Sequence, residues 1–247
     1  MGFYRGPNIV RNGLIAYYDA ANTKSYPGTG TDWYDISGNG QTASISSGEF
    51  VSGTNGGYLR NTGNVSNFFI VSVGGSVIDA ALSVTTGGWT IEEIIWTNSC
   101  DYPECDAGSV ASNPAYGVGA TGFDWNHGTN YQQFKFGQSS NSASGYEDDI
   151  TFNLPSPYNV SNYWRLRTMT WDRTNNSDSL YINGNYINSV STPNTAGGAI
   201  YDGGGISFGS LYGWKFYGRR ISIKMYDRVL TSSEILQNYN GVKNRLI

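Results

Sequence analysis

The sequence contains very little of the two residue types that most often bind metals or form covalent cross-links. There is a single histidine, His127, and there are two cysteines, Cys100 and Cys105, among 247 residues. Three such residues cannot supply the four ligands of a structural zinc site. A disulfide between the cysteines would close a small ring, so it would constrain the unfolded chain only modestly. A disulfide and two free thiols both remain open, and His127 is expected in a surface loop.

Charge is also scarce, and its sign is not the one that nucleic acids attract. Charged residues make up 14% of the chain, the net charge is −4 and the isoelectric point is about 4.9. A nucleic-acid-binding domain normally shows a basic excess, so we expect no nucleic-acid partner. There is no apolar run long enough for a transmembrane helix, so we expect no membrane partner. The first residues lack the apolar segment of a secretory signal, which predicts synthesis in the cytoplasm without export.

What the sequence does have is a large supply of aromatic residues and many short alternating runs. Aromatic residues reach 15% of the chain, which is enough to build a sizeable core. Period-two runs separated by Gly, Asn and Ser are typical of antiparallel strands with one buried face. Asn183-Gly184 between two such runs predicts a tight hairpin, because both residues tolerate positive φ. The pattern predicts an all-β protein built as a two-sheet antiparallel β-sandwich, with strands at 14–18, 89–96, 164–171 and 221–226.

One helix is predicted near the C-terminus. Thr231 and Glu234 have the spacing of a capping box, in which each side chain bonds the backbone of the other residue. Apolar residues follow at helical spacing, and Gly241 is expected to end the helix. At the other end of the chain, residues 1–11 precede the first predicted strand and contain Gly6-Pro7, so we interpret them as an N-terminal arm that could lie along a neighbouring subunit. No linker interrupts the remainder, which predicts a single domain over residues 12–247.

An ordered set of segments runs through the chain from about Asn8 onward. Its members are Gly13–Asn22, Lys24–Gly30, Trp33–Gly40, Trp89–Glu92, Trp164–Asp172, Leu180–Gly184 and Ile223–Asn240. Together they resemble a laminin-G-like or concanavalin A-like jelly-roll domain, in the version found in tailed-phage virion proteins. The resemblance implies a two-sheet jelly-roll sandwich with one short C-terminal helix.

The resemblance also implies a function. It points to a non-enzymatic virion structural protein on the surface of a phage particle, most simply a capsid decoration protein with weak glycan binding. The expected partners are other virion proteins, namely the major capsid protein or tail proteins, together with host-surface glycans and further copies of the chain. The alternative is a carbohydrate-binding protein that recognises a receptor, either in a tail fibre or as an adhesin module. A fold of this kind hosts lectins, glucanases and structural modules alike, so it does not by itself specify a ligand.

Calcium is the one cofactor that the sequence leaves open. Relatives of this type often carry an Asp-rich turn after the second strand, but here the stretch 58–64 contains no carboxylate. Asp172 and Asp178 lie close together between two predicted strands, where oxygen ligands could bind calcium weakly. Asn and Asp in such a turn also bond their own backbone without any metal, and that interpretation is the simpler one. No other cofactor is expected.

Glu92 and Glu93 are the best candidate pair for glycoside hydrolysis. The resemblance implies that a glucanase of this fold would place its two carboxylates at alternate positions of one strand. Adjacent strand residues point to opposite faces instead, whereas retaining chemistry needs two carboxyl groups about 5–5.5 Å apart on one side of the sugar. We therefore expect no enzyme activity and one outward-pointing glutamate. Glu93 shares a face with apolar residues, so its carboxylate must be either paired or exposed.

The surplus of aromatic residues suggests a contact surface. Four tryptophans in strand patterns, Trp89, Trp96, Trp164 and Trp171, are expected to pack in the fold. Others stand among glycines and polar residues that are typical of loops, where an exposed ring could stack on a sugar or anchor a protein interface. The residues predicted to make such contacts with a glycan or a protein are Trp125, Tyr131, Tyr212, Trp214 and Tyr217.

Overall fold

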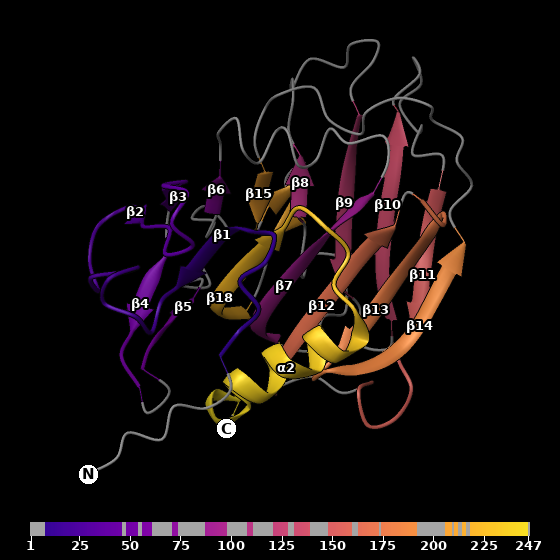
Figure 1. Cartoon of the computed structure of the whole chain (residues 1–247). Coiled ribbons are helices and arrows are strands. Elements are labelled where there is room, and N and C mark those ends of the chain that lie inside the picture. The colour runs from indigo at the N-terminus through magenta and orange to yellow at the C-terminus, as the bar shows by residue number, and fades with distance from the viewer. Residues whose placement is uncertain are drawn as a thin grey trace.

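The structure is a computed structural model of the chain (Figure 1). It describes residues 8–45, 48–53, 56–60, 71–73, 87–97, 108–110, 121–127, 131–138, 148–159, 163–172, 174–191, 206–208, 210–211, 214–215 and 218–246. The strands are β1 (Leu14–Asp19), β2 (Asp32–Trp33), β3 (Ala43–Ile45), β4 (Glu49–Val51), β5 (Tyr58–Arg60), β6 (Val71–Val73), β7 (Gly88–Thr97), β8 (Gly108–Val110), β9 (Thr121–His127), β10 (Tyr131–Gln138), β11 (Asp148–Asn153), β12 (Trp164–Asp172), β13 (Ser177–Ile182), β14 (Asn185–Ser191), β15 (Ile206–Phe208), β16 (Ser210–Leu211), β17 (Trp214–Lys215) and β18 (Gly218–Tyr226). They are followed by helix α2 (Ser232–Val242) and the short 3-10 helix η1 (Lys243–Arg245).

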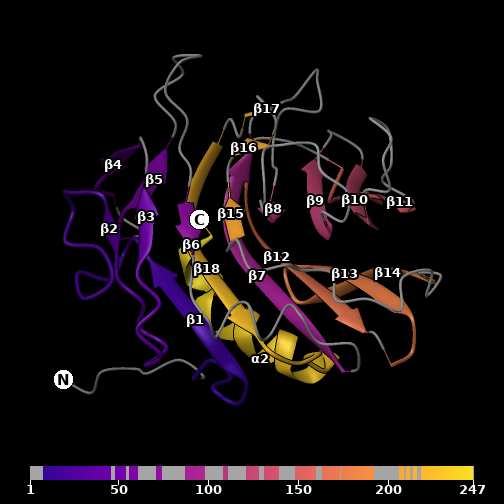
Figure 2. The ribbon, with the colours of Figure 1, turned by 90° about the horizontal axis from the view of Figure 1, so that it is seen from above.

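The strands form two antiparallel layers, which confirms the predicted all-β sandwich. One layer is a sheet in the order β14-β13-β12-β7-β18-β5-β4, in which β1 also pairs with β18. The other layer contains the sheets β2-β3-β6-β15-β8 and β11-β10-β9, with β8 next to β9. A small hairpin, β16–β17, completes the strands. Figure 2 shows α2 on the outer side of the first layer, away from the second, so that this layer has an inner and an outer face.

The hydrophobic core lies between the two layers and is rich in aromatic rings. Trp89 of β7 and Trp171 of β12 meet there with their ring centroids 5.4 Å apart. Trp33 comes from the opposite layer and is fully buried beside Tyr18. Burial of one such side chain contributes about 2–3 kcal/mol to folding. The predicted packing role of Trp89 and Trp171 is confirmed.

Strand β12 shows why the first layer has two different faces. Successive side chains of a strand point to opposite sides, so Trp164, Leu166 and Thr168 lie on the outer face, on which α2 packs. The alternate positions face the core between the layers, and they are Arg165, Arg167, Met169 and Trp171. The hairpin that follows β13 turns at Asn183 and Gly184, whose φ angles are 53° and 76°. The predicted strand over 164–171 and the predicted hairpin are both confirmed.

Helix α2 begins as the capping-box spacing predicts. The Thr231 hydroxyl accepts a bond from the Glu234 amide at 3.3 Å, and the Glu234 carboxylate accepts one from the Thr231 amide at 2.9 Å. The carboxylate also binds both terminal nitrogens of Arg228, at 2.7 and 2.9 Å. The helix ends at Val242 rather than at Gly241, because the chain continues directly into η1. Within the described residues, no helix is both long enough and apolar enough to cross a membrane.

The segment before β1 packs against the same domain. Val10 is buried, and its amide donates to the Asn238 side chain of α2 at 2.7 Å. The Asn8 carbonyl accepts a bond from Gln237 at 2.7 Å, and Arg11 donates to the Ile36 carbonyl at 3.4 Å. Residues 8–11, assigned by the sequence to a free arm, therefore belong to the domain. The reason is the long-range polar contact with α2, which the local sequence does not reveal.

Candidate functional site

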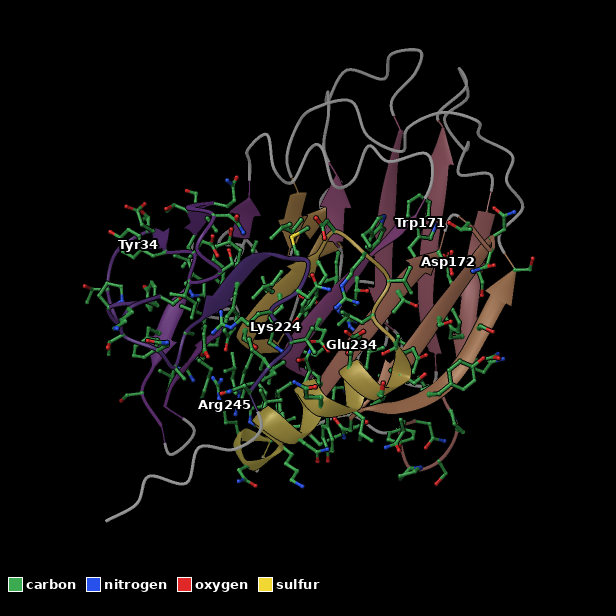
Figure 3. The ribbon with its side chains drawn as sticks, in the orientation of Figure 1. Tyr34, Trp171, Asp172, Lys224, Glu234 and Arg245 are labelled. Atoms are coloured by element: carbon green, nitrogen blue, oxygen red, sulfur yellow. The ribbon has the colours of Figure 1, made fainter. Side chains whose placement is uncertain are left out.

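Glu92 of β7 lies on the outer face, where α2 covers it. The residue is 1% exposed, and its carboxylate accepts bonds from Lys224 at 2.8 Å, Asn238 at 2.7 Å and Thr168 at 3.1 Å. In Figure 3, Lys224 lies on the side of the sheet that faces α2. Nearby, burial and then the charge of Glu92 raise the pKa of Tyr226 above its ordinary value, so its hydroxyl stays protonated and donates to the Val10 carbonyl. These bonds join β7, β18, α2 and the N-terminal segment at one buried point.

Glu93 lies on the opposite face of the same strand, in the interior of the sandwich. It is also 1% exposed. Its carboxylate binds Arg167 of β12 at 2.5 Å and Arg220 of β18 at 3.0 Å, and both of these side chains are equally buried. The prediction that Glu93 must be paired or exposed is confirmed in its first form. A buried charge requires such partners, because an unpaired one would lose its hydration without compensation.

These two carboxylates do not form a hydrolytic pair. They point to opposite faces, as the adjacent positions predict, and neither faces solvent. The prediction that one of them points outward into solvent is wrong, because α2 covers the face on which Glu92 lies. Lys224 binds the Glu92 carboxylate instead, and Arg167 and Arg220 bind that of Glu93.

The two aspartates considered for calcium are separated by the pleat of the sheet. Asp172 pairs with Ser177 across the β12–β13 hairpin, so Asp178 lies on the opposite face and is fully buried. Asp172 accepts bonds from the Asn175 amide at 2.9 Å and from its side chain at 2.7 Å, which is the turn-forming role. Within the described part of the chain, no group of three His, Cys, Asp or Glu side chains is arranged to bind a metal. Because the register places Asp172 and Asp178 on opposite faces of the sheet, it argues against a single calcium ion bound by both.

The aromatic residues predicted to make contacts fall into two groups. Trp125 and His127 lie in β9 and Trp214 begins β17, so the predictions of a loop at these three residues are wrong, whereas Tyr131 is the first residue of β10. In the backbone register, Trp125 of β9 pairs with Phe134 of β10, and Tyr131 pairs with Asn153 of β11. Local glycine and polar residues suggested loops, but antiparallel pairing of β9 with the next strand, β10, produced strands. The predictions that lie outside the described residues concern Tyr212, Tyr217, Cys100 and Cys105.

The outer face carries a cluster that the sequence did not single out. Five residues form one continuous row of paired positions across β4, β5, β18, β7 and β12. The row lies just beyond the last residue of α2, Val242, whose apolar cluster borders it. In order across the sheet, its members are Glu49, Arg60, Arg219, Trp96 and Trp164.

Three aromatic rings and one guanidinium form the centre of this cluster. The Arg219 guanidinium carbon lies 4.0 Å from the ring centroid of Trp96 and 5.2 Å from that of Tyr58. Tyr58 in turn meets Trp164 edge-on, with ring centroids 5.5 Å apart. All four side chains are half-buried. We call Tyr58, Trp96, Trp164 and Arg219 the outer-face platform.

The sequence offered only part of the signal for this platform. Trp96 and Trp164 were expected to pack in the fold, but both stay half-buried on the face opposite to Trp89. Strand alternation alone places Trp96 and Trp89 on opposite faces, since they are separated by an odd number of positions. The contribution of Tyr58 and Arg219 depends on the pairing of β5 with β18, which brings together residues far apart in the chain.

The fold resembles binding domains of bacterial toxins. The binding domain of Paraclostridial Mosquitocidal Protein 1 superposes with a TM-score of 0.66 at 20% identity, over 93% of this chain and 52% of that chain. A structure of botulinum neurotoxin type C, described as depending on two ganglioside molecules for cell entry, has a TM-score of 0.66 at 14% identity, over 94% and 52%. The binding domain of botulinum neurotoxin DC in complex with rat synaptotagmin II has a TM-score of 0.63 at 15% identity, over 94% and 52%.

These similarities concern the fold, because sequence identity is low throughout. The chain spans about half the length of the matched toxin chains, with 52% of each covered. No family model matches the sequence, and no curated protein matches it.

Proposed function

We propose that this chain is a non-catalytic recognition domain that binds a glycan at a cell surface. The observation that carries the proposal is the outer-face platform, in which half-buried aromatic rings from three strands share the outer face of the sheet beyond the end of α2. Half-buried aromatic residues combine a large apolar area with a fixed orientation, which suits stacking against the C–H face of a sugar ring. The rings are held by paired strands, so little conformational freedom is lost on binding.

Two further findings support a binding role without catalysis. The best carboxylate pair is sequestered, since Glu92 and Glu93 are both buried and both bound to cations. The similar structures are binding domains, and two of them are described with a ganglioside or a protein receptor. Because the identity to them is low, this similarity favours binding in general and leaves the ligand to the residues of this chain.

A glycan array with the purified chain tests the proposal. We expect saturable binding to a subset of glycans that is lost in Trp96→Ala and in Trp164→Ala. Tyr186→Ala is the matched control, because Tyr186 is an exposed aromatic residue on the edge strand β14, 54% accessible and apart from the platform. The sequence-predicted residues Tyr131 and Trp214 are changed to alanine in parallel. Absence of binding to any glycan by the folded wild type would refute the proposal.

A place on a virion surface is the second candidate, and the ordered resemblance to tailed-phage jelly rolls favours it. In this form the domain decorates the capsid or belongs to a tail or fibre, with capsid or tail proteins and further copies of itself as partners. Glycan binding and attachment to a particle are compatible, because they can use different faces. Mixing the chain with particles that lack it, and counting bound copies by mass spectrometry, tests this role. Saturation at a stoichiometry that matches the shell supports decoration, whereas no binding to heads or tails contradicts it.

A further inference from the structure

Resting on the proposed function, we propose that the outer-face platform binds a sugar that carries a carboxylate, and that Arg219 is the residue that recognises this carboxylate. The sugar ring lies against Trp96, Trp164 and Tyr58. The inference adds the ligand class and the residue that recognises it to the general binding role. It follows from the charge balance of the row, from the geometry of Arg219 and from the contrast with the other cations of the same sheet.

The charge balance of the row is unusual for this protein. The chain as a whole has a net charge of −4, yet Arg60 and Arg219 occupy directly paired positions on β5 and β18. Like charges placed opposite each other in a sheet destabilise it. Arg60 is compensated by Glu49, whose carboxylate lies 2.8 and 2.9 Å from two of its nitrogens. Arg219 has no carboxylate partner within the part of the chain that the structure describes, so an external anion would complete the row.

The geometry of Arg219 leaves its hydrogen-bonding groups suited to a carboxylate. Its contacts with Trp96 and Tyr58 are made with the guanidinium above each ring. A guanidinium carries its N–H donors in its own plane, in a fork that matches the two oxygens of a carboxylate. Because the aromatic contacts already restrain the side chain, it loses less freedom on binding than a free arginine would.

Five other described cations belong to this sheet, and Arg60 among them is bound to Glu49. Lys224 lies under α2 and binds Glu92, while Arg167 and Arg220 lie inside the sandwich and bind Glu93. These three and Arg165 of β12 are at most 1% exposed, so none of the four can meet a ligand from solvent. Arg219 is half-buried on the uncovered part of the outer face, next to rings that can hold a sugar. Recognition of an anionic sugar therefore falls to this one cation.

Two matched pairs of probes test the inference by calorimetric titration of the full chain. Trigalacturonate and its trimethyl ester share the same sugar backbone, but the ester replaces each charged carboxylate with a neutral methyl ester, and sialyllactose and lactose differ by one acidic sugar. We expect the wild type to bind at least one charged probe at least tenfold more tightly than its neutral counterpart. Arg219→Gln should reduce this preference to less than twofold.

Two further variants separate charge from geometry and from folding. Arg219→Lys keeps the charge without the planar fork, so we expect an intermediate preference. Arg60→Gln is the control, because the charge of Arg60 is already compensated by Glu49, and it should change the preference less than twofold. Circular dichroism and thermal unfolding confirm that each variant is folded.

The outcomes distinguish this inference from the proposed function. Glycan binding that is equal for charged and neutral probes, or a preference that survives Arg219→Gln, overturns the acidic-sugar inference and leaves the proposed function standing. Displacement of the charged probe by inorganic phosphate at an equal concentration also overturns it, since the platform would then be a general anion site. Failure of the folded wild type to bind any glycan on the array refutes the proposed function, and the inference falls with it.

Discussion

The outer face of the first layer has two regions, and a cation has different surroundings in each. Under α2, Lys224 is fully buried and its ammonium binds the Glu92 carboxylate at 2.8 Å. Beyond the end of the helix, Arg219 lies on the same face of the same strand, β18, and its guanidinium lies over the rings of Trp96 and Tyr58. Helix α2 covers the first region and not the second, whereas the same strands build both.

The difference shows which charges hold the fold together and which are available for a ligand. A cation that loses all contact with water needs a carboxylate, because desolvation costs several kcal/mol per ion in real proteins. A half-buried guanidinium keeps part of its hydration and is stabilised by about 0.5–1 kcal/mol through a ring. The covered region therefore attaches α2 and the N-terminal segment, whereas the uncovered region places a cation that has no carboxylate partner among the described residues next to flat apolar rings.

The largest expected effect comes from breaking the covered region. Glu92→Ala leaves the Lys224 ammonium buried without its carboxylate, and removal of one partner of such a pair costs about 3–5 kcal/mol of unfolding free energy. Urea unfolding monitored by fluorescence measures it. The double variant Glu92→Leu with Lys224→Met removes both charges and should be more stable than Glu92→Ala. Equal stability of Glu92→Ala and the wild type would show that the buried pair does not hold this region.

A smaller loss is expected at the C-terminal border of the covered region. Arg245 of η1 binds Asp19 of β1 through two bonds of 2.6 and 2.8 Å, and Asp19 also accepts a bond from the Tyr17 hydroxyl. Asp19→Ala should cost about 2–3 kcal/mol, because it removes a charge-assisted pair and leaves Tyr17 without its acceptor. Denaturant unfolding measures this loss, and Arg245→Lys should recover part of it. A midpoint unchanged by Asp19→Ala would contradict the role of this pair in docking η1.

The N-terminal border of α2 should show a pH dependence. The bond from Arg228 chiefly, together with those from Thr231, lowers the pKa of Glu234 from 4.5 to about 2, although burial opposes the shift. The stabilisation is therefore complete above about pH 4.5 and is lost as the pH falls toward 2. At pH 7, Glu234→Gln should cost about 1–2 kcal/mol, since glutamine keeps the capping box and loses the ion pair. Unfolding of both proteins at pH 7, 4 and 2 measures the difference, which should shrink across this range. A constant difference would contradict this assignment.

The smallest effect on stability is expected in the uncovered region. Arg219→Gln removes only contacts with rings, and it also relieves the repulsion with Arg60, so the net change should be within about 1 kcal/mol. The same urea unfolding measures it beside Glu92→Ala. A loss comparable to that of Glu92→Ala would show that Arg219 is a structural residue, and the contrast between the two regions would disappear.

Much of the fold could be predicted because its signals are local. The alternation of β12, the Asn183-Gly184 turn and the Thr231–Glu234 capping box each depend on residues within a few positions of one another. Their chemistry is a property of short segments, so it survives without knowledge of the rest of the chain. Where the local signal was ambiguous, as around Trp125, glycines and polar residues suggested a loop and the pairing of β9 with β10 made a strand.

The candidate site was less predictable, since its members come from distant segments. Trp96 and Trp164 were noticed as strand residues, but neither their half-exposed positions nor the stacking of Arg219 can be read from spacing. The same holds for Val10, whose amide reaches Asn238 more than two hundred positions later in the chain. Such contacts depend on which strands become neighbours, and a period-two pattern does not specify its own partner.

The sequence by itself determined that this chain forms a two-layer β-sandwich with one capped helix, and that Glu92 and Glu93 point to opposite faces. Only the tertiary structure decided that α2 covers one part of the outer face and leaves the other open, and with that which cations are neutralised. The physical reason is that periodicity follows from the geometry of a single strand, whereas coverage follows from packing between elements that are far apart in the chain.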